Sequence, residues 1–477
     1  MDSRPDILLL MSDQHRGDCL GCAGHPAVQT PHLDGLAAEG VRFPHAYSEC
    51  PVCVPARRTL MTGRFPARHG VVMNHIPETP LPGPTLPERL TRYGYHTHLC
   101  GKLHLTPPRK LHGFMSADWA DNPKAAPKVK DGRTVVSDYQ RFIAAEGPRV
   151  PAFSDAHGLS ANTPVARAWH GEERLHFTNW VTDRALDFLD RRDPTAPFFL
   201  KVSYLHPHPP CTPPQFYYDR YLGMDFAERP VGNWARLFDE PPRRHPRDPH
   251  RIHLPPAAQR QLEAAYYGCI NHIDDQINRI LMALPRPAET LILYVSDHGE
   301  MLGDHQWFRK HVPWEGAARI PFIIRPPESW GIRPGHECPA PVQLADVMPT
   351  VLAAAGIDIP ETVDGTDLRP AVEGTGAPRE FVHGECAQVP TLGSGVHYLT
   401  DGRRKYIWFP GAGTEQFFNL EHDPCECHDL AAEPGAAGEV ARWRARLAER
   451  LNGRPEGFVS SGRLNRLDGP TAFRPFH

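Results

Sequence analysis

The chain lacks several features that would assign a protein to a class at once. No apolar run approaches the ~18 residues that cross a bilayer, and the N-terminal segment MDSRPDILLLMSDQ lacks a charged leader followed by a cleavable apolar stretch. Charge of one sign is also lacking, because 52 Lys and Arg stand against 56 Asp and Glu, a formal net charge of −4. This balance argues against a basic nucleic-acid-binding surface. We therefore expect a cytoplasmic protein whose partners include neither a membrane nor a nucleic acid.

Cysteines and low-complexity segments exclude two further classes. The 477 residues contain 11 cysteines, an odd number scattered along the chain, which does not indicate a disulfide framework. We expect most of them to be buried thiols. Proline (53 residues) is at about twice its usual share, but with glycine (39 residues) it stays below the ~25–30% typical of disorder. The excess indicates rigid turns, and no internal repeat is visible.

Four short apolar runs end abruptly at polar residues: ILLLM, PFFLKVSYL, TLILYV and IPFII. Runs of this length flanked by turn formers indicate buried strands. Helical patterns lie between them, one over residues 31–39 with Thr30 as the N-cap and one following Pro256, with apolar residues every three or four positions. This alternation predicts an α/β fold with a large, mostly parallel sheet flanked by helices, in which functional residues gather at the carboxyl ends of the strands.

We predict two domains, a catalytic α/β domain over residues 1–375 and a small C-terminal α+β domain over 376–477. Beyond a Gly- and Pro-containing stretch, short strand-like segments precede a last amphipathic helix that carries Val440, Trp443, Leu447 and Leu451. Within the first domain, residues 106–175 and 209–255 show little periodicity. We expect these two segments to be long surface loops that wall a site.

The segment CPVCVPARRTLMTGR, residues 50–64, contains the most informative pattern, Cys-x-Pro-x-Arg starting at Cys53. A Cys-x-x-Cys pair can also serve redox chemistry or bind zinc, and a second pair, Cys19 and Cys22, lies upstream. The gap between the pairs is longer than the ~15–20 residues usual for a zinc site. A zinc-stabilised or inactive binding protein therefore stays as an alternative from another functional class.

Ordered matches extend along nearly the whole chain: VQTPHLDGLAAEGVRF, CVPARRTLMTGRFPARHG, GYHTHLCGKLHL, PHPP, SDHGEMLGDHQWFRKHVPWEGAARIPFI, VDGTDLRPAVEG and FFNLEHDPCE. With these motifs the chain resembles the formylglycine-dependent sulfatases of the alkaline phosphatase superfamily, in the branch of choline-sulfatases and phosphonate monoester hydrolases. The resemblance implies an alkaline-phosphatase-like fold. It also implies that a maturation enzyme oxidises Cys53 to formylglycine, whose hydrated aldehyde is the nucleophile. Ala56 departs from the pattern, since many members carry Ser there.

The resemblance assigns one divalent metal ion to Asp13, Gln14, Asp297 and His298, completed by an oxygen of the modified Cys53. An anionic ester needs such a cation to polarise it, and two carboxylates at strand ends fit this requirement. Asp13 and Gln14 alone would fit a turn cap equally well. Family practice favours calcium, whereas an imidazole with only two carboxylates shifts the preference toward manganese.

Around the reacting anion the resemblance places five basic or imidazole side chains: Arg57, Lys102, His104, His208 and Lys310. The arginine and lysines would neutralise the transferred group. In the implied mechanism His208 or Lys310 protonates the departing alcohol, and His104 deprotonates the second hydroxyl of the hydrate. The resemblance further suggests that Asn74 contacts substrate and that Glu315 orients Lys310.

The sequence thus predicts a sulfuric ester hydrolase that acts on a small-molecule or saccharide sulfate monoester. The preference for sulfate depends on Lys102 and His104, where the phosphonate-hydrolase branch tends to carry neutral hydroxyl side chains. A phosphonate monoester or phosphodiester hydrolase is the alternative enzyme, favoured by Gln14 and Asn74. The sequence leaves open which alcohol carries the sulfate and whether the chain forms a homo-oligomer.

Overall fold

The computed structural model describes residues 4–74, 79–121, 128–130, 133–146, 159, 162–235, 250–251, 254–376, 379–389 and 394–467. Its centre is an eight-stranded sheet with the order β11-β2-β10-β9-β1-β8-β4-β5. These strands are β1 (Asp6–Asp13), β2 (Val41–Arg42), β4 (His96–Gly101), β5 (Ser116–Trp119), β8 (Phe198–Pro207), β9 (Thr290–Ser296), β10 (Phe322–Arg325) and β11 (His336–Glu337).

All four predicted strands are present, as β1, β8, β9 and β10, and the sheet is mostly parallel as expected. The central strand β1 pairs in parallel with β8 on one side and β9 on the other, whereas β10 runs antiparallel to β9. Ser12 lies opposite Ser296 in the register of β1 and β9. The residues that follow these two positions, Asp13 and Asp297, therefore leave the sheet at the same edge.

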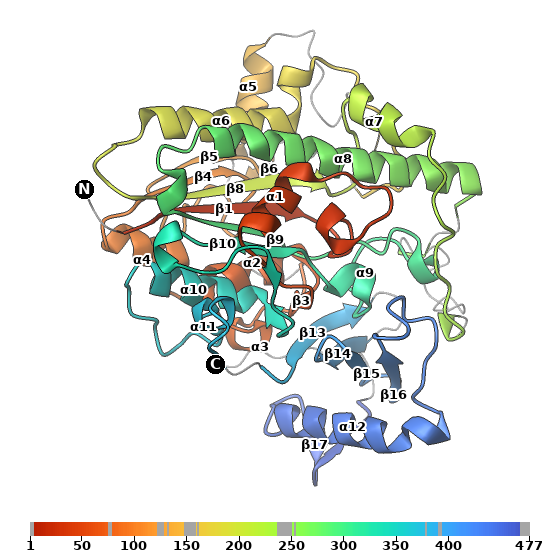
Figure 1. Cartoon of the computed structure of the whole chain (residues 1–477). Helices are drawn as coiled ribbons and strands as arrows, with labels where there is room; N and C mark the ends of the chain where they lie inside the picture. Colours follow the sequence, from red (N-terminus) through yellow and green to blue (C-terminus); the bar gives the residue numbers. More distant parts are fainter. Residues whose placement is uncertain are drawn as a thin grey trace.

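Helices cover both faces of the sheet (Figure 1). One face of β1 presents Leu8 and Leu10 to α1 (Pro31–Glu39), α6 (Phe177–Arg191) and α8 (Pro256–Met282). The other face presents Ile7, Leu9 and Met11 to α2 (Cys53–Thr62), α4 (Leu86–Arg92) and α10 (Val347–Ala354). Complete burial of each such aliphatic side chain stabilises the fold by about 1.5–3 kcal/mol.

The predicted helix over residues 31–39 is confirmed as α1, but its cap is not the expected one. The Thr30 hydroxyl donates to Asp34 at 2.9 Å and makes no cap bond. The first turn is capped instead by Asp274 of α8, whose carboxylate accepts from the backbone N–H of His32 at 3.1 Å and of Leu33 at 2.8 Å. A side chain distant in sequence therefore supplies the cap.

The two segments expected to be long loops contain regular structure. Residues 106–175 include β5, which extends the central sheet beside β4, the hairpin of β6 (Lys128–Lys130) and β7 (Arg133–Val135), and α5 (Asp138–Ala145). Residues 209–255 include α7 (Gln215–Leu222). The expectation is wrong for these pieces because elements this short carry too little periodicity to be recognised. Residues 122–127, 131–132, 147–158, 160–161, 236–249 and 252–253 lie outside the described part.

The C-terminal part forms the expected strands and final helix. An antiparallel sheet with the order β13-β14-β15-β16 packs one face on α12 (Ala437–Leu451), the blue elements of Figure 1. Its opposite face meets the first part of the chain, where Tyr398 donates to the carbonyl of Ser48 at 2.6 Å. The strands are β13 (Val382–Val389), β14 (Ser394–Thr400), β15 (Arg404–Phe409) and β16 (Thr414–Asn419), and a division at residue 375 stays a prediction.

The remaining elements are short: α3 (Pro66–His69), α9 (Glu315–Ala318), α11 (Arg369–Val372), β3 (Ala46–Tyr47), β12 (Val342–Gln343), β17 (Val459–Ser460) and β18 (Arg463–Leu464). None of the helices in the described residues combines enough length and apolarity to cross a bilayer.

Candidate active site

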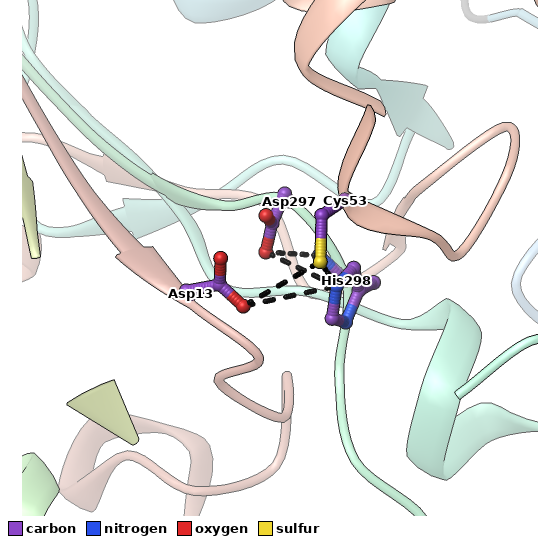
Figure 2. A group of neighbouring side chains, drawn as sticks. All are labelled: Asp13, Cys53, Asp297 and His298. Atoms are coloured by element: carbon purple, nitrogen blue, oxygen red, sulfur yellow. Dashed lines mark hydrogen bonds and ion pairs between the residues drawn. The ribbon is translucent and has the colours of Figure 1, made fainter. Parts of the chain in front are cut away.

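Four potential ligand groups from three parts of the chain meet at one edge of the sheet (Figure 2). Asp13 ends β1, Asp297 and His298 follow β9, and Cys53 is the first residue of α2. The Cys53 Sγ lies 3.2 Å from Nε2 of His298 and 3.9 Å from Oδ1 of Asp13. All four are buried, and one ligand atom from each lies within 4.8 Å of the others, so this group could hold a metal ion.

The hydrogen bonds around these groups orient them toward their common centre. Nδ1 of His298 donates to the Gly299 carbonyl at 2.9 Å, which leaves Nε2 directed at Asp13, Asp297 and Cys53. A backbone partner on the second ring nitrogen is the usual arrangement for a metal-ligating histidine. Oδ1 of Asp297 accepts the backbone N–H groups of Gln14 and His298, each at 3.1 Å.

Cys53 lies at the N-terminus of α2, where unpaired backbone N–H groups favour negative charge. Lys310 donates to its sulfur at 3.0 Å and to Oε1 of Gln14 at 2.7 Å. Burial acts to raise the pKa of the Cys53 thiol, but the charges of Lys310 and Lys102 outweigh it and hold that pKa well below its usual value. The site is therefore built to stabilise an anion at the position of this side chain.

Arg57 lies one helical turn after Cys53 and bridges the carboxylates of Asp13 and Asp297. Its Nε donates to Asp297 at 2.8 Å and its Nη2 to Asp13 at 2.9 Å, while Nη1 donates to the Lys102 carbonyl and the Ser203 hydroxyl. Every guanidinium nitrogen is thus engaged with protein. Arg57 is expected from the sequence to face the reacting anion, whereas the structure shows it holding the carboxylates.

Lys102 and His104 follow the end of β4. The Lys102 ammonium donates to Asp13 at 2.5 Å. Burial and the nearby Cys53 act to raise the pKa of Asp13, but the charges of Lys102 and Arg57 hold it well below its usual range. His104 has a φ of 55°, a conformation costly for a residue with a side chain, and Oδ1 of Asp121 accepts its backbone N–H at 2.6 Å.

His208 completes the set of residues near the sulfur of Cys53. Its Nδ1 donates to the Pro209 carbonyl at 2.8 Å, and its ring also interacts with Cys53. Burial, aided by the charge of Lys310, lowers the pKa of His208 to about 3, so its imidazole is neutral at pH 7. The structure thus brings every predicted ligand and every predicted basic or imidazole residue into one site.

A sulfatase family profile matches residues 5–357, three quarters of the chain. The chain belongs to the sulfatase family. A second profile, described as N-sulphoglucosamine sulphohydrolase, C-terminal, matches residues 303–453. This membership confirms the predicted family and makes the protein an enzyme that hydrolyses sulfate esters.

Individual relatives extend the match over nearly the full length of the sulfatase. It is 38% identical over 472 residues to an arylsulfatase of Clostridium perfringens, covering 97% of both chains, and 31% identical to a choline-sulfatase of Rhizobium meliloti, covering 90% of this chain and 83% of the relative. A crystal structure of the phosphonate monoester hydrolase of Agrobacterium radiobacter superposes with a TM-score of 0.77 at 25% identity, covering 94% and 95% of the two chains. These matches confirm the alkaline-phosphatase-like fold.

Two further predicted residues of the sulfatase have contacts within the protein, and a contact of Asn74 with substrate stays a prediction. Oδ1 of Asn74 accepts the backbone N–H of Val54 at 2.9 Å, so Asn74 caps the helix that presents Cys53. Glu315 does not orient Lys310. Its carboxylate pairs with Lys405 at 2.8 Å and Arg319 at 3.1 Å, because the C-terminal sheet brings Lys405 to this position.

Glu300 is a buried site residue that the sequence analysis missed. Its carboxylate accepts from the Gln14 amide and from the backbone N–H groups of Leu302 and Arg309, so it fixes the orientation of the Gln14 side chain. Its position directly after the Ser-Asp-His-Gly motif is the signal that could have identified it.

The cysteines of the sulfatase do not form the alternative zinc site. All eleven are free and most are buried, as predicted. Among the described residues, the groups able to hold a metal are three, and Cys53 is the only member of the two Cys-x-x-Cys pairs in any of them. The four-cysteine zinc hypothesis is therefore wrong.

Proposed function

We propose that this sulfatase converts a sulfate monoester to an alcohol and inorganic sulfate, with a formylglycine formed from Cys53 as its nucleophile and one divalent metal ion. One observation carries the proposal. The only cysteine followed by Pro two positions later and Arg four positions later lies with its sulfur 3.2 Å from His298 Nε2 and 3.0 Å from the Lys310 ammonium.

The donor set fits a divalent cation. Asp13, Asp297 and His298 would hold it, together with an oxygen replacing the sulfur of Cys53 and the amide oxygen of Gln14. Two buried carboxylates offset the charge of such an ion. When bound, the ion polarises the ester and the hydrated aldehyde supplies the attacking oxygen. Calcium stays the proposed ion on family grounds, and manganese the alternative that an imidazole ligand favours.

The cationic side chains of this chain then have distinct tasks. Arg57 keeps Asp13 and Asp297 in place through its fixed fork of donors. Lys102 and Lys310 approach the centre from two sides and neutralise the transferred group. Both lysines are buried and their ammonium groups are held by protein partners, so their charges are already oriented when the ester arrives.

Proton delivery to the departing alcohol is assigned to Lys310. The neutral His208 has one ring N–H, and it is already donated to the Pro209 carbonyl. Lys310 has three N–H groups, of which Gln14 and Cys53 accept two. His208 then serves as an acceptor, because its second ring nitrogen carries a lone pair and its ring interacts with the Cys53 side chain.

His104 is assigned the abstraction of the proton whose loss releases sulfate from the nucleophile. Its Nδ1 is buried and has no hydrogen-bond partner among the described residues. The ring of His104 is also within reach of the Cys53 side chain, because a hydrogen bond between them acts to lower the pKa of the Cys53 thiol. The hydrogen bond that the His104 backbone N–H donates to Asp121 keeps the ring near Cys53.

The substrate class follows from the relatives and from two site residues. The named relatives include an arylsulfatase and a choline-sulfatase, which supports a small-molecule or saccharide sulfate ester. Similarity to a phosphonate monoester hydrolase, with Gln14 and Asn74, supports phosphonate monoesters or phosphodiesters as the second candidate. Lys102 and His104 favour sulfate.

The test is a hydrolysis panel with aryl sulfate, sugar sulfates, choline sulfate, an aryl phosphonate and a phosphodiester. The protein is produced with a formylglycine-generating enzyme, and peptide mass spectrometry should show thiol-to-aldehyde conversion at Cys53. Cys53→Ala should abolish turnover, whereas the matched variant Cys50→Ala, three residues earlier in the chain, should retain it. Full activity with unmodified Cys53, or a preference for phosphonate, would contradict the proposal.

A further inference from the structure

A second cluster of potential ligands, which shares no residue with the active-site group, lies on β4 and β5. It consists of His98, Cys100 and Asp118, and one ligand atom from each lies within 4.8 Å of the others. His98 and Cys100 are two positions apart on β4, so both side chains point to the same face of the sheet. Cys100 is directly opposite Asp118 in the parallel register of β4 and β5.

The histidine of this cluster is held as a ligand would be. Its Nδ1 lies 2.7 Å from the Ser116 hydroxyl, and its Nε2 lies 3.1 Å from Oδ2 of Asp118. Its ring stacks on Phe188 of α6 with the planes 3° apart. With Nδ1–H donated to the Ser116 hydroxyl, Nε2 presents its lone pair on the side of Asp118, where the two groups can bind a cation together.

Charge also points to a cation. Cys100 is fully buried and lies directly opposite Asp118. A thiolate and a carboxylate are costly side by side in a buried place unless a positive charge lies between them. With a divalent ion, one thiolate, one carboxylate and a neutral imidazole give a net charge of zero.

We propose that His98, Cys100 and Asp118 form a zinc site that fastens the edge strand β5 to β4. A thiolate and an imidazole are ligands that zinc prefers and that calcium and magnesium do not, so this site differs in selectivity from the active site. Three protein ligands leave the fourth tetrahedral position to water. The Asp118 side chain, 32% exposed, provides the way in.

The experiment uses the full chain carrying Cys53→Ala, which removes the active-site thiol, after treatment with a chelator. Cobalt(II) alone is titrated in, and the thiolate-to-cobalt charge-transfer band in the near ultraviolet is followed. One equivalent of cobalt should produce the band, and zinc should displace it. Cys100→Ser should lose the band, whereas the matched variant Cys22→Ser, a cysteine outside the cluster, should keep it.

Two milder variants keep the test decisive if Cys100→Ser does not fold. Asp118→Asn preserves size and should weaken cobalt binding. Ser116→Ala removes only the partner of the ligand histidine and should weaken binding about 10–100-fold. A band that persists in Cys100→Ser, disappears in Cys22→Ser, or is unchanged in both milder variants would overturn the proposal. None of these readouts depends on sulfatase activity.

Discussion

Replacing the buried Lys405 by methionine should destabilise the protein by breaking the link between its C-terminal sheet and the catalytic part. Lys405 lies on β15 and is fully buried. Its ammonium pairs with Glu315 at 2.8 Å and with Glu426 at 3.1 Å, and it lies 5.4–5.6 Å from the ring centres of Tyr398 and Tyr47. Two carboxylates and two aromatic faces thus surround one cation.

The expected loss of unfolding free energy depends on the charged groups that remain buried in the variant. Breaking a buried ion pair by removing one partner costs about 3–5 kcal/mol, because the other charge is left uncompensated. Here Glu426 is left without the cation that it faces, whereas Glu315 keeps its pair with Arg319 at 3.1 Å. Burial already raises the pKa of Glu426 to about 7 even with Lys405 present, so the variant should bind a proton there at neutral pH. The loss should therefore be about 3–5 kcal/mol near pH 8 and smaller near pH 5.

Urea unfolding followed by tryptophan fluorescence measures this loss, since the fully buried Trp314 bonds to Gln416 across the same junction. Lys110→Met, at an exposed lysine, is the matched control and should change stability by less than about 0.5 kcal/mol. Combining Lys405→Met with Glu426→Gln should cost less than the sum of the two changes. A loss below about 1 kcal/mol in Lys405→Met, or no pH dependence, would refute the reasoning.

Three further changes test the site and its surroundings. Arg57→Lys keeps one charge but cannot bridge Asp13 and Asp297, so steady-state kinetics should show kcat/KM falling at least about 100-fold; a normal value would contradict the bridging role. Glu300→Gln should weaken metal reactivation of chelated enzyme about 10–100-fold, because it releases the amide of Gln14, a proposed metal ligand. Unchanged reactivation would argue against this role of Glu300. Burial lowers the pKa of His15 to about 4, so the unfolded chain binds its proton first and stability falls as pH drops from 6.5 toward 4. In urea titrations His15→Gln should reduce the loss between pH 7.5 and 4.5 by about 2.5 kcal/mol, and an unchanged pH profile would exclude His15 as its source.

The strand ends that form the site could be predicted because local signals agree with the global fold there. Asp13 and Asp297 each follow an apolar run short enough to be a buried strand, and parallel pairing brings such ends together. Cys53 could also be identified without the structure, because the pattern Cys-x-Pro-x-Arg is contiguous in the chain. What sequence reasoning identified was therefore chemistry attached directly to secondary structure.

Partners that meet across long separations could not be predicted in this way. Glu315 stands five residues after Lys310, which suggests an interaction along the chain, but its partner Lys405 is 90 residues away. The orientation of Arg57 likewise depends on how β1 and β9 bring two carboxylates under one helix. Spacing reports which residues share an element, whereas these contacts depend on how elements pack.

The net charge of the site with its metal ion bound does not by itself distinguish sulfate esters from phosphonate esters. Arg57, Lys102 and Lys310 face two carboxylates, and a bound divalent ion makes the site strongly positive. Sulfate monoesters and phosphonate monoesters are both monoanions at neutral pH, so this field attracts them alike. We therefore propose that discrimination comes from Lys102 and His104, where the phosphonate-hydrolase branch tends to carry neutral hydroxyl side chains. The double variant Lys102→Tyr with His104→Thr should lower kcat/KM for an aryl sulfate much more than for the matched aryl phosphonate. An equal loss for both esters would show that the two residues serve general binding and that selectivity resides elsewhere in the pocket.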